Sequence, residues 1–321
     1  MTPATDLAAA TSEQEALHAG CGLVDRSERG KLAVTGSEAK SFLQGQVTND
    51  VEGLEPGRGL YAAFLTHKGK MLGDLRILDA GDELLLDCER PTLQELFNLL
   101  RRTKLGRDAE LDKRTLQRGL LSLIGPEARR VAGAGATGLG ESEHDHAEAE
   151  LGGAPVRLIA AGGGDVDVLC LAEDTERVAA ALREAGAIPV SEDAAEVVRV
   201  ERGRPRYGHE LDDTVIPQEA GLNQRAVSFT KGCYVGQETV ARLHYRGKPN
   251  RHLRGLRLAA AGVEPGTELR LGEKVVGRVG TVADSPAFGP IALAIVRREA
   301  APGDSVAAGE TTATVVELPF R

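Results

Sequence analysis

The sequence has no tryptophan and few aromatic residues of any kind. Its 321 residues include six phenylalanines and four tyrosines, although 41% of all residues are apolar. The hydrophobic cores must therefore be built mainly from leucine, valine and alanine. Tyr207, Tyr234 and Tyr245 fall in one short span, whereas Tyr61 lies elsewhere. A chain of this length predicts two or three packed domains.

The four cysteines show no pattern typical of a metal site or a disulfide framework. Cys21, Cys88, Cys170 and Cys233 are far apart, and no Cys-x-x-Cys pair occurs. This spacing argues against a redox dithiol and favours a reducing cytoplasm as the compartment. The stretch 132–153, rich in Gly, Ala and Glu, contains His144 and His146. We interpret this stretch as a solvated surface connection and predict no metal site there.

Long apolar runs and targeting segments are missing as well. No apolar run approaches the ~20 residues that a membrane span requires. The first residues lack the basic and apolar regions of a signal peptide. We therefore expect a cytoplasmic protein that makes no use of a membrane.

Nucleotide-binding fingerprints are also absent, and positive charge is scarce overall. Neither Gly-x-Gly-x-x-Gly after a strand nor a Gly-Lys-Ser loop occurs, and the formal net charge is −9. This charge argues against a protein that binds nucleic acid over its whole surface. One segment differs, because no acidic residue occurs between Glu238 and Glu264. It contains Arg242, Arg246, Lys248, Arg251, Arg254 and Arg257. The segment is either a solvated basic strand and turn or an anion-binding surface.

Hydrophobic periodicity predicts an α+β fold. Residues 31–35 alternate like a strand, and Ser37 is the expected N-cap of the following helix. An antiparallel meander is predicted over 60–87, and a helix after Pro91. Further strands are expected at 156–160 and 166–171, with helices at 174–185 and 193–202. Beyond Asn250, runs at 253–258, 268–271, 274–283, 290–297 and 311–317 predict a small all-β barrel or sandwich.

The stretch Lys231-Gly-Cys-Tyr-Val-Gly-Gln-Glu238 is the most informative part of the chain. It sets Cys233 beside Lys231 and just before a predicted helix start, and both features favour the thiolate form of a cysteine. The alternative interpretation is an ordinary buried cysteine in a tight turn.

A second unusual stretch is Arg199-Val-Glu-Arg-Gly-Arg-Pro-Arg-Tyr-Gly-His-Glu210. It is either a helix end with internal salt bridges or the wall of a pocket. A pterin edge needs one carboxylate that accepts two hydrogen bonds, and an anionic tail needs arginine.

These motifs resemble the YgfZ family of folate-binding proteins, which is related to the T-protein (aminomethyltransferase) of the glycine cleavage system. The specific element is the cysteine motif at 231–238. Others follow the order and spacing of the family: Asp25-Arg-Ser, Val34-Thr-Gly36, Phe42-Leu-Gln44, Thr48-Asn-Asp50, Leu54-Glu-Pro-Gly57, Arg199-Val-Glu-x-Gly203, Tyr207-Gly-x-Glu210 and Pro217-x-Glu-Ala-Gly221.

The resemblance implies a three-domain ring made of two interleaved split βαβ (ferredoxin-like) domains and a C-terminal antiparallel β-barrel. We assign 1–50 with 151–248 to a discontinuous folate-binding domain, 51–150 to a second α+β domain, and 249–321 to the barrel.

The resemblance also implies a site for tetrahydrofolate or a one-carbon derivative. In Gly69-Lys-Met-Leu-Gly-Asp-Leu75, Asp74 matches a T-protein aspartate, whereas Gly73 stands where T-proteins have another aspartate. Glu201 matches the glutamate that holds the pterin edge. On chemical grounds, Tyr207 or Tyr234 would stack on the folate, and Arg242 or Arg246 would meet its glutamate tail. The predicted catalytic residues are Cys233, Lys231 and Asp74.

The leading hypothesis is a monomeric folate-binding protein that supports assembly or repair of iron–sulfur clusters in client enzymes, and through them tRNA modification. Its predicted partners are folate and iron–sulfur client or assembly proteins. The alternative is a T-protein-like aminomethyltransferase or demethylase, and turnover is left open. Direct binding of tRNA through the basic segment 242–257 is a less favoured third hypothesis.

Overall fold

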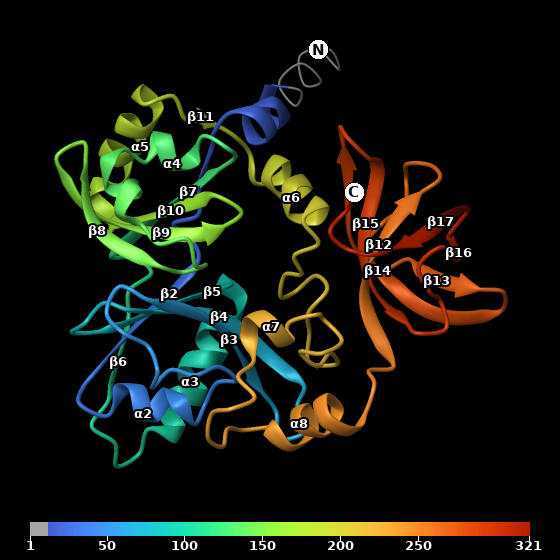
Figure 1. Ribbon diagram of the computed structural model, residues 1–321, viewed down its shortest axis with the longest axis horizontal. Helices are drawn as coiled ribbons and strands as arrows, with labels where there is room; N and C mark the ends of the chain where they lie inside the picture. The colour runs from blue at the N-terminus through green and yellow to red at the C-terminus, as the bar shows by residue number, and fades with distance from the viewer. Residues whose placement is uncertain (1–11) are drawn as a thin grey trace. The chain divides into compact units, whose positions relative to one another are not determined.

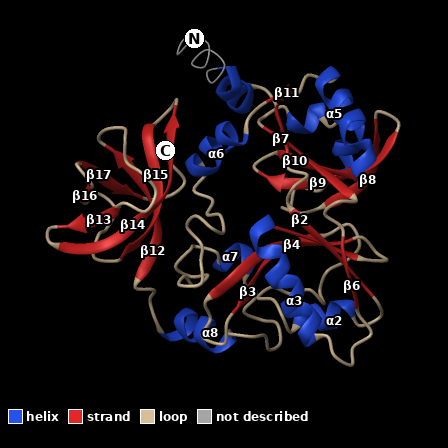
Figure 2. Cartoon of the chain, turned by 180° about the vertical axis from the view of Figure 1, so that it is seen from behind, coloured by secondary structure: helices blue, strands red, loops and turns tan. Residues whose placement is uncertain are grey.

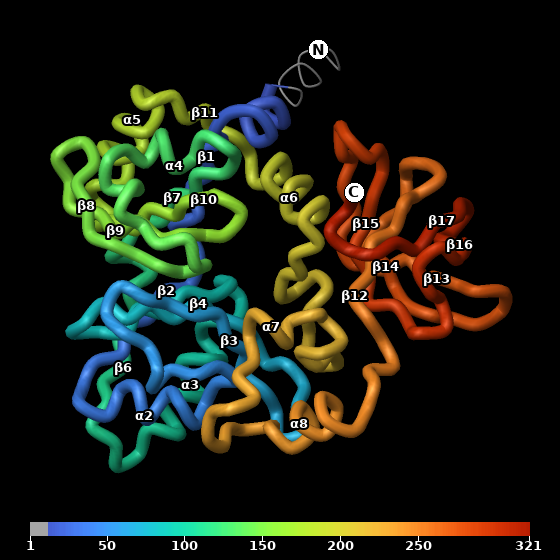
Figure 3. Tube along the Cα trace, in the orientation of Figure 1, coloured from blue at the N-terminus to red at the C-terminus, as the bar shows by residue number. Residues whose placement is uncertain are grey.

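The computed structural model describes residues 12–321 and divides into two compact units (Figure 1). Unit 1 comprises the chain up to Ala62 together with Asp74–Ala195. Unit 2 comprises Ala63–Gly73 and Glu196–Arg321. Residues 63–73, at the tip of the hairpin between the third and fourth strands, therefore belong to unit 2. The tube in Figure 3 traces the chain from blue in its N-terminal part to red at its C-terminus.

Unit 1 contains a mixed six-stranded sheet, called sheet 1, with the strand order β11-β1-β7-β10-β9-β8. Its strands are β1 (Gly22–Asp25), β7 (Arg118–Ile124), β8 (His146–Leu151), β9 (Ala154–Gly162), β10 (Asp165–Leu171) and β11 (Ile188–Pro189). The β1–β11 pair is parallel and the other pairs are antiparallel. Helices α4 (Ala128–Val131) and α5 (Thr175–Glu184) lie along one face, with short 3₁₀ turns at Ala134–Gly138 and Ala172–Asp174.

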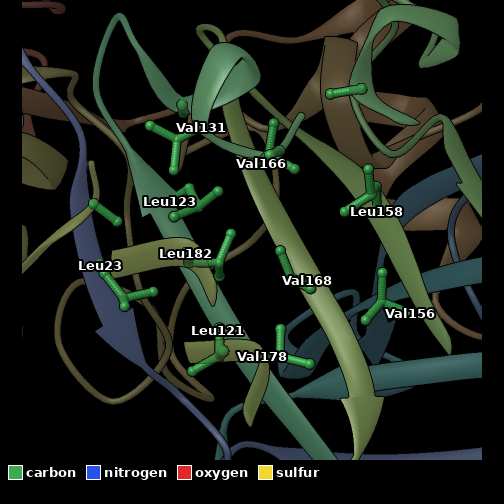
Figure 4. Packing of buried hydrophobic residues seen from close by; sticks show 14 of the residues in the cluster. Leu23, Leu121, Leu123, Val131, Val156, Leu158, Val166, Val168, Val178 and Leu182 are labelled. Carbon is green, nitrogen blue, oxygen red and sulfur yellow. The ribbon is translucent and has the colours of Figure 1, made fainter. Parts of the chain in front are cut away.

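The core on that face forms because alternate residues of each strand point to the same side. Val166 and Val168 of β10 meet Val178 and Leu182 of α5 in one buried cluster, and Val131 of α4 belongs to it (Figure 4). The intervening residue positions of the same strands point to the opposite face of sheet 1.

The second sheet of unit 1, sheet 2, has the order β3-β4-β5-β2-β6. Its strands are β2 (Gly30–Thr35), β3 (Gly59–Leu65), β4 (Met71–Asp79), β5 (Leu84–Cys88) and β6 (Glu110–Lys113). The meander predicted over 60–87 is thereby confirmed. Helices α2 (Ala39–Gln44) and α3 (Leu93–Thr103) flank this sheet (Figure 2), and α3 follows the 3₁₀ turn Arg90–Thr92.

Sheets 1 and 2 face each other across a small apolar cluster. It joins Ala33, Leu78 and Leu85 of sheet 2 to Leu120, Ile159 and Leu169 of sheet 1. Asp74 and Arg76 have the same parity along β4 as Leu78, so the alternation of the strand directs them to this face as well. Unit 1 thus places charged side chains between two sheets.

Unit 2 is built around a closed antiparallel barrel with the order β12-β15-β14-β13-β16-β17. The strands are β12 (Arg251–Leu258), β13 (Glu268–Leu271), β14 (Lys274–Ser285), β15 (Gly289–Arg297), β16 (Ser305–Ala308) and β17 (Thr311–Val316). The helices α6 (Glu192–Glu201, which begins in unit 1), α7 (Asn223–Ala226) and α8 (Gln237–Arg246) precede it. The prediction of an α+β protein with a C-terminal β-barrel is confirmed. Strand β16 was not predicted, because its small residues give no strong strand signal.

Two local predictions were wrong. Ser37 is not a helix N-cap: its hydroxyl donates to Asp108 Oδ2 at 2.5 Å, and α2 begins later, at Ala39. The stretch 132–153 is not simply a surface connection either, because it contains β8. His144 and His146 are 8% and 4% exposed, since backbone pairing and ion pairs draw this polar segment inward.

The three domain ranges assigned from the sequence stay a prediction, as does their arrangement in a ring. The two compact units divide the chain at other positions, namely after residues 62, 73 and 195. Between residues 12 and 321, no helix has the length and apolar character needed to cross a membrane.

Candidate functional site

Asp74 lies in β4 and is 6% exposed. The hydroxyl of Tyr61, on the neighbouring strand β3, donates a hydrogen bond to its carboxylate. The backbone carbonyl of Tyr61 in turn accepts from the side-chain amide of Asn49 at 2.8 Å, in the Thr48-Asn-Asp50 motif. Two adjacent strands and the loop after α2 thus fix one carboxylate and its donor.

Burial makes Asp74 a weak acid for an aspartate. Loss of solvation raises its pKa from the ordinary 3.8 to about 6, while the hydrogen bond from Tyr61 lowers it in part. Glu89 raises the pKa further and Arg29 opposes this effect. A carboxyl group that titrates near pH 6 can hold or release a proton at physiological pH, which suits proton transfer at an amine or a ring nitrogen.

A partly buried chain of ion pairs runs from sheet 2 to sheet 1 on the same inter-sheet face. Arg29 contacts Asp87 at 2.6 Å, and Arg76 pairs with both Asp87 and Asp167. Burial alone would raise the pKa of Asp87, but Arg29 and Arg76 hold it well below its usual range. Asp167 also accepts from the hydroxyl of Ser122 at 2.6 Å. This chain joins the two sheets, and its Arg29 lowers the pKa of Asp74.

Glu201 is the last residue of α6 and is 8% exposed. Its Oε1 accepts a 2.5 Å hydrogen bond from the hydroxyl of Ser285 at the end of β14, and its backbone carbonyl accepts from Phe320. The neighbouring Val200 packs in an apolar cluster with Phe320 and barrel residues. The carboxylate is therefore held in a fixed orientation at the junction of helix and barrel.

The arginine-rich stretch after Arg199 forms internal ion pairs, as one of the two sequence interpretations predicted. Arg199 Nη1 contacts Glu210 Oε2 at 3.0 Å, and Arg206 contacts Glu196 at 2.9 Å. Thr281 donates to the other oxygen of Glu210 at 2.5 Å, at a bulge in β14. Gly280 is required there, because a Cβ would lie 2.8 Å from Glu210 Oε1. Arg199 and Arg206 thus fasten the loop after α6 to the helix, and the hydrogen bond between Thr281 and Glu210 fastens it to the barrel.

The loop that carries Cys233 ends at Gly236, which precedes α8 in a left-handed conformation with φ 83°. A Cβ on Gly236 would lie 2.5 Å from the backbone oxygen of Thr66, and one on Gly69 would lie 2.8 Å from Thr239. Two glycines therefore let the cysteine loop dock on the turn between β3 and β4. The helix start predicted directly after the cysteine motif is confirmed, with α8 beginning at Gln237.

Cys233 is exposed, whereas Cys21, Cys88 and Cys170 are 1–3% exposed. Burial raises the pKa of Cys21 and of Cys88 to about 12 and also raises the pKa of Cys170. Those three thiols are held protonated and out of reach. Cys233 is the one thiol that an external molecule can meet.

Lys231 and Tyr234 contact each other beside Cys233. The ammonium of Lys231 lies 5.2 Å from the centre of the Tyr234 ring, within the range of a cation–π interaction. Tyr234 is 8% exposed, and burial raises its pKa to about 12. Its ring thus supports the loop, while Tyr207 is half-buried in the loop before Glu210.

The basic segment predicted as one surface is divided in the structure. Arg251 pairs with Glu219 at 2.7 Å, and Arg254 with Glu317 at 3.0 Å. Arg257 lies over the ring of Phe288 at 5.1 Å. These three arginines have internal roles, so the anion-binding interpretation narrows to the part of the segment in and after α8.

On α8, exposed cations stand beside a cluster of rings. Arg242, Arg246 and Lys248 are exposed and form no ion pair with any of residues 12–321. Phe229 stacks on His244 with ring centres 3.7 Å apart, and Tyr245 meets His244 edge-on. Tyr245 is 66% exposed. This surface offers positive charge and flat apolar faces to an anionic partner.

Asp74 belongs to unit 1, while Glu201, Tyr207, Lys231, Cys233, Tyr234, Arg242 and Arg246 belong to unit 2. Tyr61 was not predicted as a site residue, although its isolation from the other tyrosines was visible. Its signal is the two-strand hairpin, which sets residue 61 near residue 74 across β3 and β4. No group of three or more His, Cys, Asp or Glu side chains suited to a metal ion occurs in the described range 12–321.

Comparison with solved structures identifies the class of fold. The glycine cleavage system aminomethyltransferase T from Bartonella henselae superimposes with a TM-score of 0.85, at 22% sequence identity, over 97% of this chain and 89% of that one. Two helix-flanked β-sheets together with a closed β-barrel thus form an aminomethyltransferase-like fold.

Sequence comparison gives the family. A match to the GCVT N-terminal domain spans residues 4–231, and the chain belongs to this family. A chloroplastic protein of Arabidopsis thaliana, which carries the provisional name of a transferase, is 29% identical over 333 residues, covering 96% of this chain and 74% of the relative. Members of the GCVT family use tetrahydrofolate, which fits the fold described here.

Proposed function

We propose that this chain is a tetrahydrofolate-binding protein of the YgfZ type that supports assembly or repair of iron–sulfur clusters in client enzymes, and through them tRNA modification. It would act as a monomer in a reducing cytoplasm. The observation that carries the proposal is the exposure of Cys233 in its motif while the other three cysteines are buried. A single thiol cannot hold a cluster that needs about four protein ligands, so Cys233 would act on clusters jointly with a client or assembly protein.

The carboxylates fit the folate part of this proposal. Glu201, held by Ser285, would accept hydrogen bonds from the pterin edge. Asp74, with Tyr61 as its donor, would face the reduced ring and hold a proton there. Tyr207 or Tyr234 would stack, and Arg242 or Arg246, both exposed, would meet the glutamate tail of tetrahydrofolate or of a one-carbon derivative.

Calorimetric titration with 5-formyltetrahydrofolate tests folate binding, with Glu201→Gln as the variant. We expect wild-type binding to weaken about tenfold or more in Glu201→Gln, because a hydrogen bond to a charged group contributes about 1.5–3 kcal/mol. The variant Glu317→Gln changes an exposed glutamate of the same unit and serves as the control. Absence of wild-type binding would refute the folate assignment.

A separate experiment tests the thiol. In cells that lack the native gene, Cys233→Ser should lose the ability to maintain the activity of an iron–sulfur enzyme, whereas Thr230→Ala in the same loop should retain it. Wild-type enzyme activity in cells carrying Cys233→Ser would rule out a role for this thiol.

The second candidate function is aminomethyl transfer or demethylation onto tetrahydrofolate. It is favoured by the fold shared with an aminomethyltransferase and by the raised pKa of Asp74. It is opposed by Gly73, which stands where T-proteins carry another aspartate. Formation of methylenetetrahydrofolate from an aminomethyl donor, abolished in Asp74→Asn, would establish it.

Direct binding of tRNA remains a less favoured third function, through Arg242, Arg246 and Lys248. If it occurs, the affinity should fall by about one log unit per log of salt for each phosphate contacted.

A further inference from the structure

The segment before β8 contains a strained backbone conformation at a residue other than glycine. Among residues 12–321, His144 is the one non-glycine residue with a positive φ, at 75°. Such a conformation costs about 1–3 kcal/mol at a non-glycine residue and persists where the surroundings impose it. Glycine occupies the 23 other positive-φ positions of the described chain. A turn that needed only this backbone shape would be made more cheaply with glycine.

The surroundings of His144 do impose this conformation. Its backbone N–H donates to the carbonyl of Ala160 in β9 at 2.7 Å. The next residue, Asp145, pairs with Arg58 at 2.6 Å, directly before β3. The segment is thereby fastened to β9 on one side and to the start of β3 on the other.

His146 adds a third attachment with a defined tautomer. Its Nδ1 accepts from Arg157 at 2.9 Å, so Nε2 carries the proton and donates to the carbonyl of Arg58 at 3.2 Å. Burial lowers the pKa of His146 to about 4, which keeps the ring neutral and this arrangement intact. The clamp on β3 is therefore stable across the physiological pH range.

The clamp brings His144 against the strand that carries Tyr61. At Gly59, a Cβ would lie 2.7 Å from the carbonyl oxygen of His144 and 2.9 Å from its Cβ, so only glycine allows this approach. Two residues later, the ring of Tyr61 lies 6.4 Å from the ring of His144, with a tilt of 36°. The phenol of Tyr61 in turn donates to Asp74.

We propose that His144 is a positioning residue for the Tyr61–Asp74 pair: its ring, carried on a strained backbone, braces the Tyr61 ring and keeps the phenol directed at the carboxylate. The consequence for folate rests on the proposed function, in which Asp74 faces the reduced ring. The effect on Tyr61 does not rest on it.

The variant His144→Gly separates positioning from stability. Glycine relieves the positive-φ strain, which offsets part of the stability lost with the buried ring, so the variant should still fold while the brace is lost. Because the protein has no tryptophan, its near-ultraviolet emission comes from four tyrosines. The Tyr61 contribution is obtained by difference against Tyr61→Phe. We expect it to increase in His144→Gly, since a phenol released from a carboxylate loses a quencher, and 5-formyltetrahydrofolate should bind about tenfold more weakly.

His209→Gly, at an exposed histidine in unit 2, is the matched control and should leave the Tyr61 contribution unchanged. If His144→Gly fails to fold, His144→Asn keeps a residue that tolerates this backbone region and serves the same test. An unchanged Tyr61 contribution in the folded variant would overturn the proposal. A changed contribution without folate binding by the wild type would support the brace and refute the proposed folate site.

Discussion

The buried carboxylate of unit 1 and the exposed thiol of unit 2 are opposite kinds of chemical group. Asp74 lies in β4 of sheet 2, its side chain faces sheet 1, and its carboxylate accepts a hydrogen bond from Tyr61. Cys233 sits in a loop, in contact with solvent, next to a helix start. Burial changes the acidity of Asp74, whereas exposure leaves the thiol of Cys233 accessible to other molecules. The contrast is between a buried carboxylate whose surroundings set its acidity and a thiol that solvent can reach.

The largest expected effect tests whether Cys233 is more accessible than the other three cysteines. Alkylation by iodoacetamide, followed by mass spectrometry of tryptic peptides, should label Cys233 about a thousandfold or more faster than the other three cysteines. A buried thiol reacts only after an opening that costs several kcal/mol, and its raised pKa slows it further. In urea, all four cysteines should react at similar rates. Comparable labelling in the folded protein would abolish the distinction.

The second-largest effect tests the burial of Asp74 through the pH dependence of the free energy of unfolding. Because the folded pKa of Asp74 is about 6 and its ordinary value is 3.8, the folded state binds a proton more tightly than the unfolded chain between these pH values. Ionisation of Asp74 therefore costs ~3 kcal/mol of unfolding free energy as the pH rises through this window. Asp74→Asn cannot ionise and should lose this pH-dependent cost.

Urea denaturation followed by circular dichroism at about pH 4 and about pH 7 provides the measurement. Relative to the wild type, Asp74→Asn should gain stability between the two pH values, whereas Asp82→Asn, at an exposed site, should track the wild type. A parallel pH dependence of Asp74→Asn and wild type would mean that Asp74 is ionised at no cost.

Strand periodicity predicted most of what surrounds these two groups, and the misses have a common cause. The strands of sheet 2, the helix after Cys233 and five of the six barrel strands follow from alternation, glycine placement and turn residues. The buried segment around His144 could not be predicted, because distant partners hold it in place: Asp145 pairs with Arg58, 87 positions away, and His146 accepts from Arg157, 11 positions away. Likewise, the predicted hairpin brings residues 61 and 74 near each other, but the hydrogen bond between Tyr61 and Asp74 depends on the register of β3 against β4.

The basic segment shows the same limit for charge. A count of arginines cannot separate Arg251 and Arg254, which are neutralised by distant glutamates, from Arg242 and Arg246, which are exposed. In the Arg199 stretch, tertiary contacts likewise show that Arg199 and Arg206 form internal ion pairs. Sequence motifs therefore located the candidate chemistry, but the division between structural and available side chains came from tertiary contacts.

A third, smaller effect concerns the donor to Asp74. Tyr61→Phe keeps the ring but removes the hydroxyl, and this hydrogen bond lowers the pKa of Asp74. The pKa should therefore rise by about one unit, equivalent to ~1.4 kcal/mol. To measure this rise, the pH dependence of the free energy of unfolding is compared between Tyr61→Phe and the double variant Tyr61→Phe/Asp74→Asn. The pH window in which these two differ should lie higher than the window in which wild type and Asp74→Asn differ. An unmoved window would show that the phenol does not interact with the ionised carboxylate.

The smallest expected effect tests how much the loop that carries Cys233 contributes to the stability of the protein. Lys231→Met removes the charge above the Tyr234 ring but keeps an unbranched apolar side chain. We expect a loss of only about 0.5–1 kcal/mol in the free energy of unfolding, the usual contribution of a cation–π contact whose cation stays partly solvated. Lys68→Met, at an exposed lysine of the turn between β3 and β4, controls for loss of charge. A loss several times larger, measured by the same urea denaturation, would mean that the loop is part of a rigid core. In that case the thiol would be fixed in place like Asp74, and the division between an enclosed carboxylate and an accessible thiol would no longer describe the molecule.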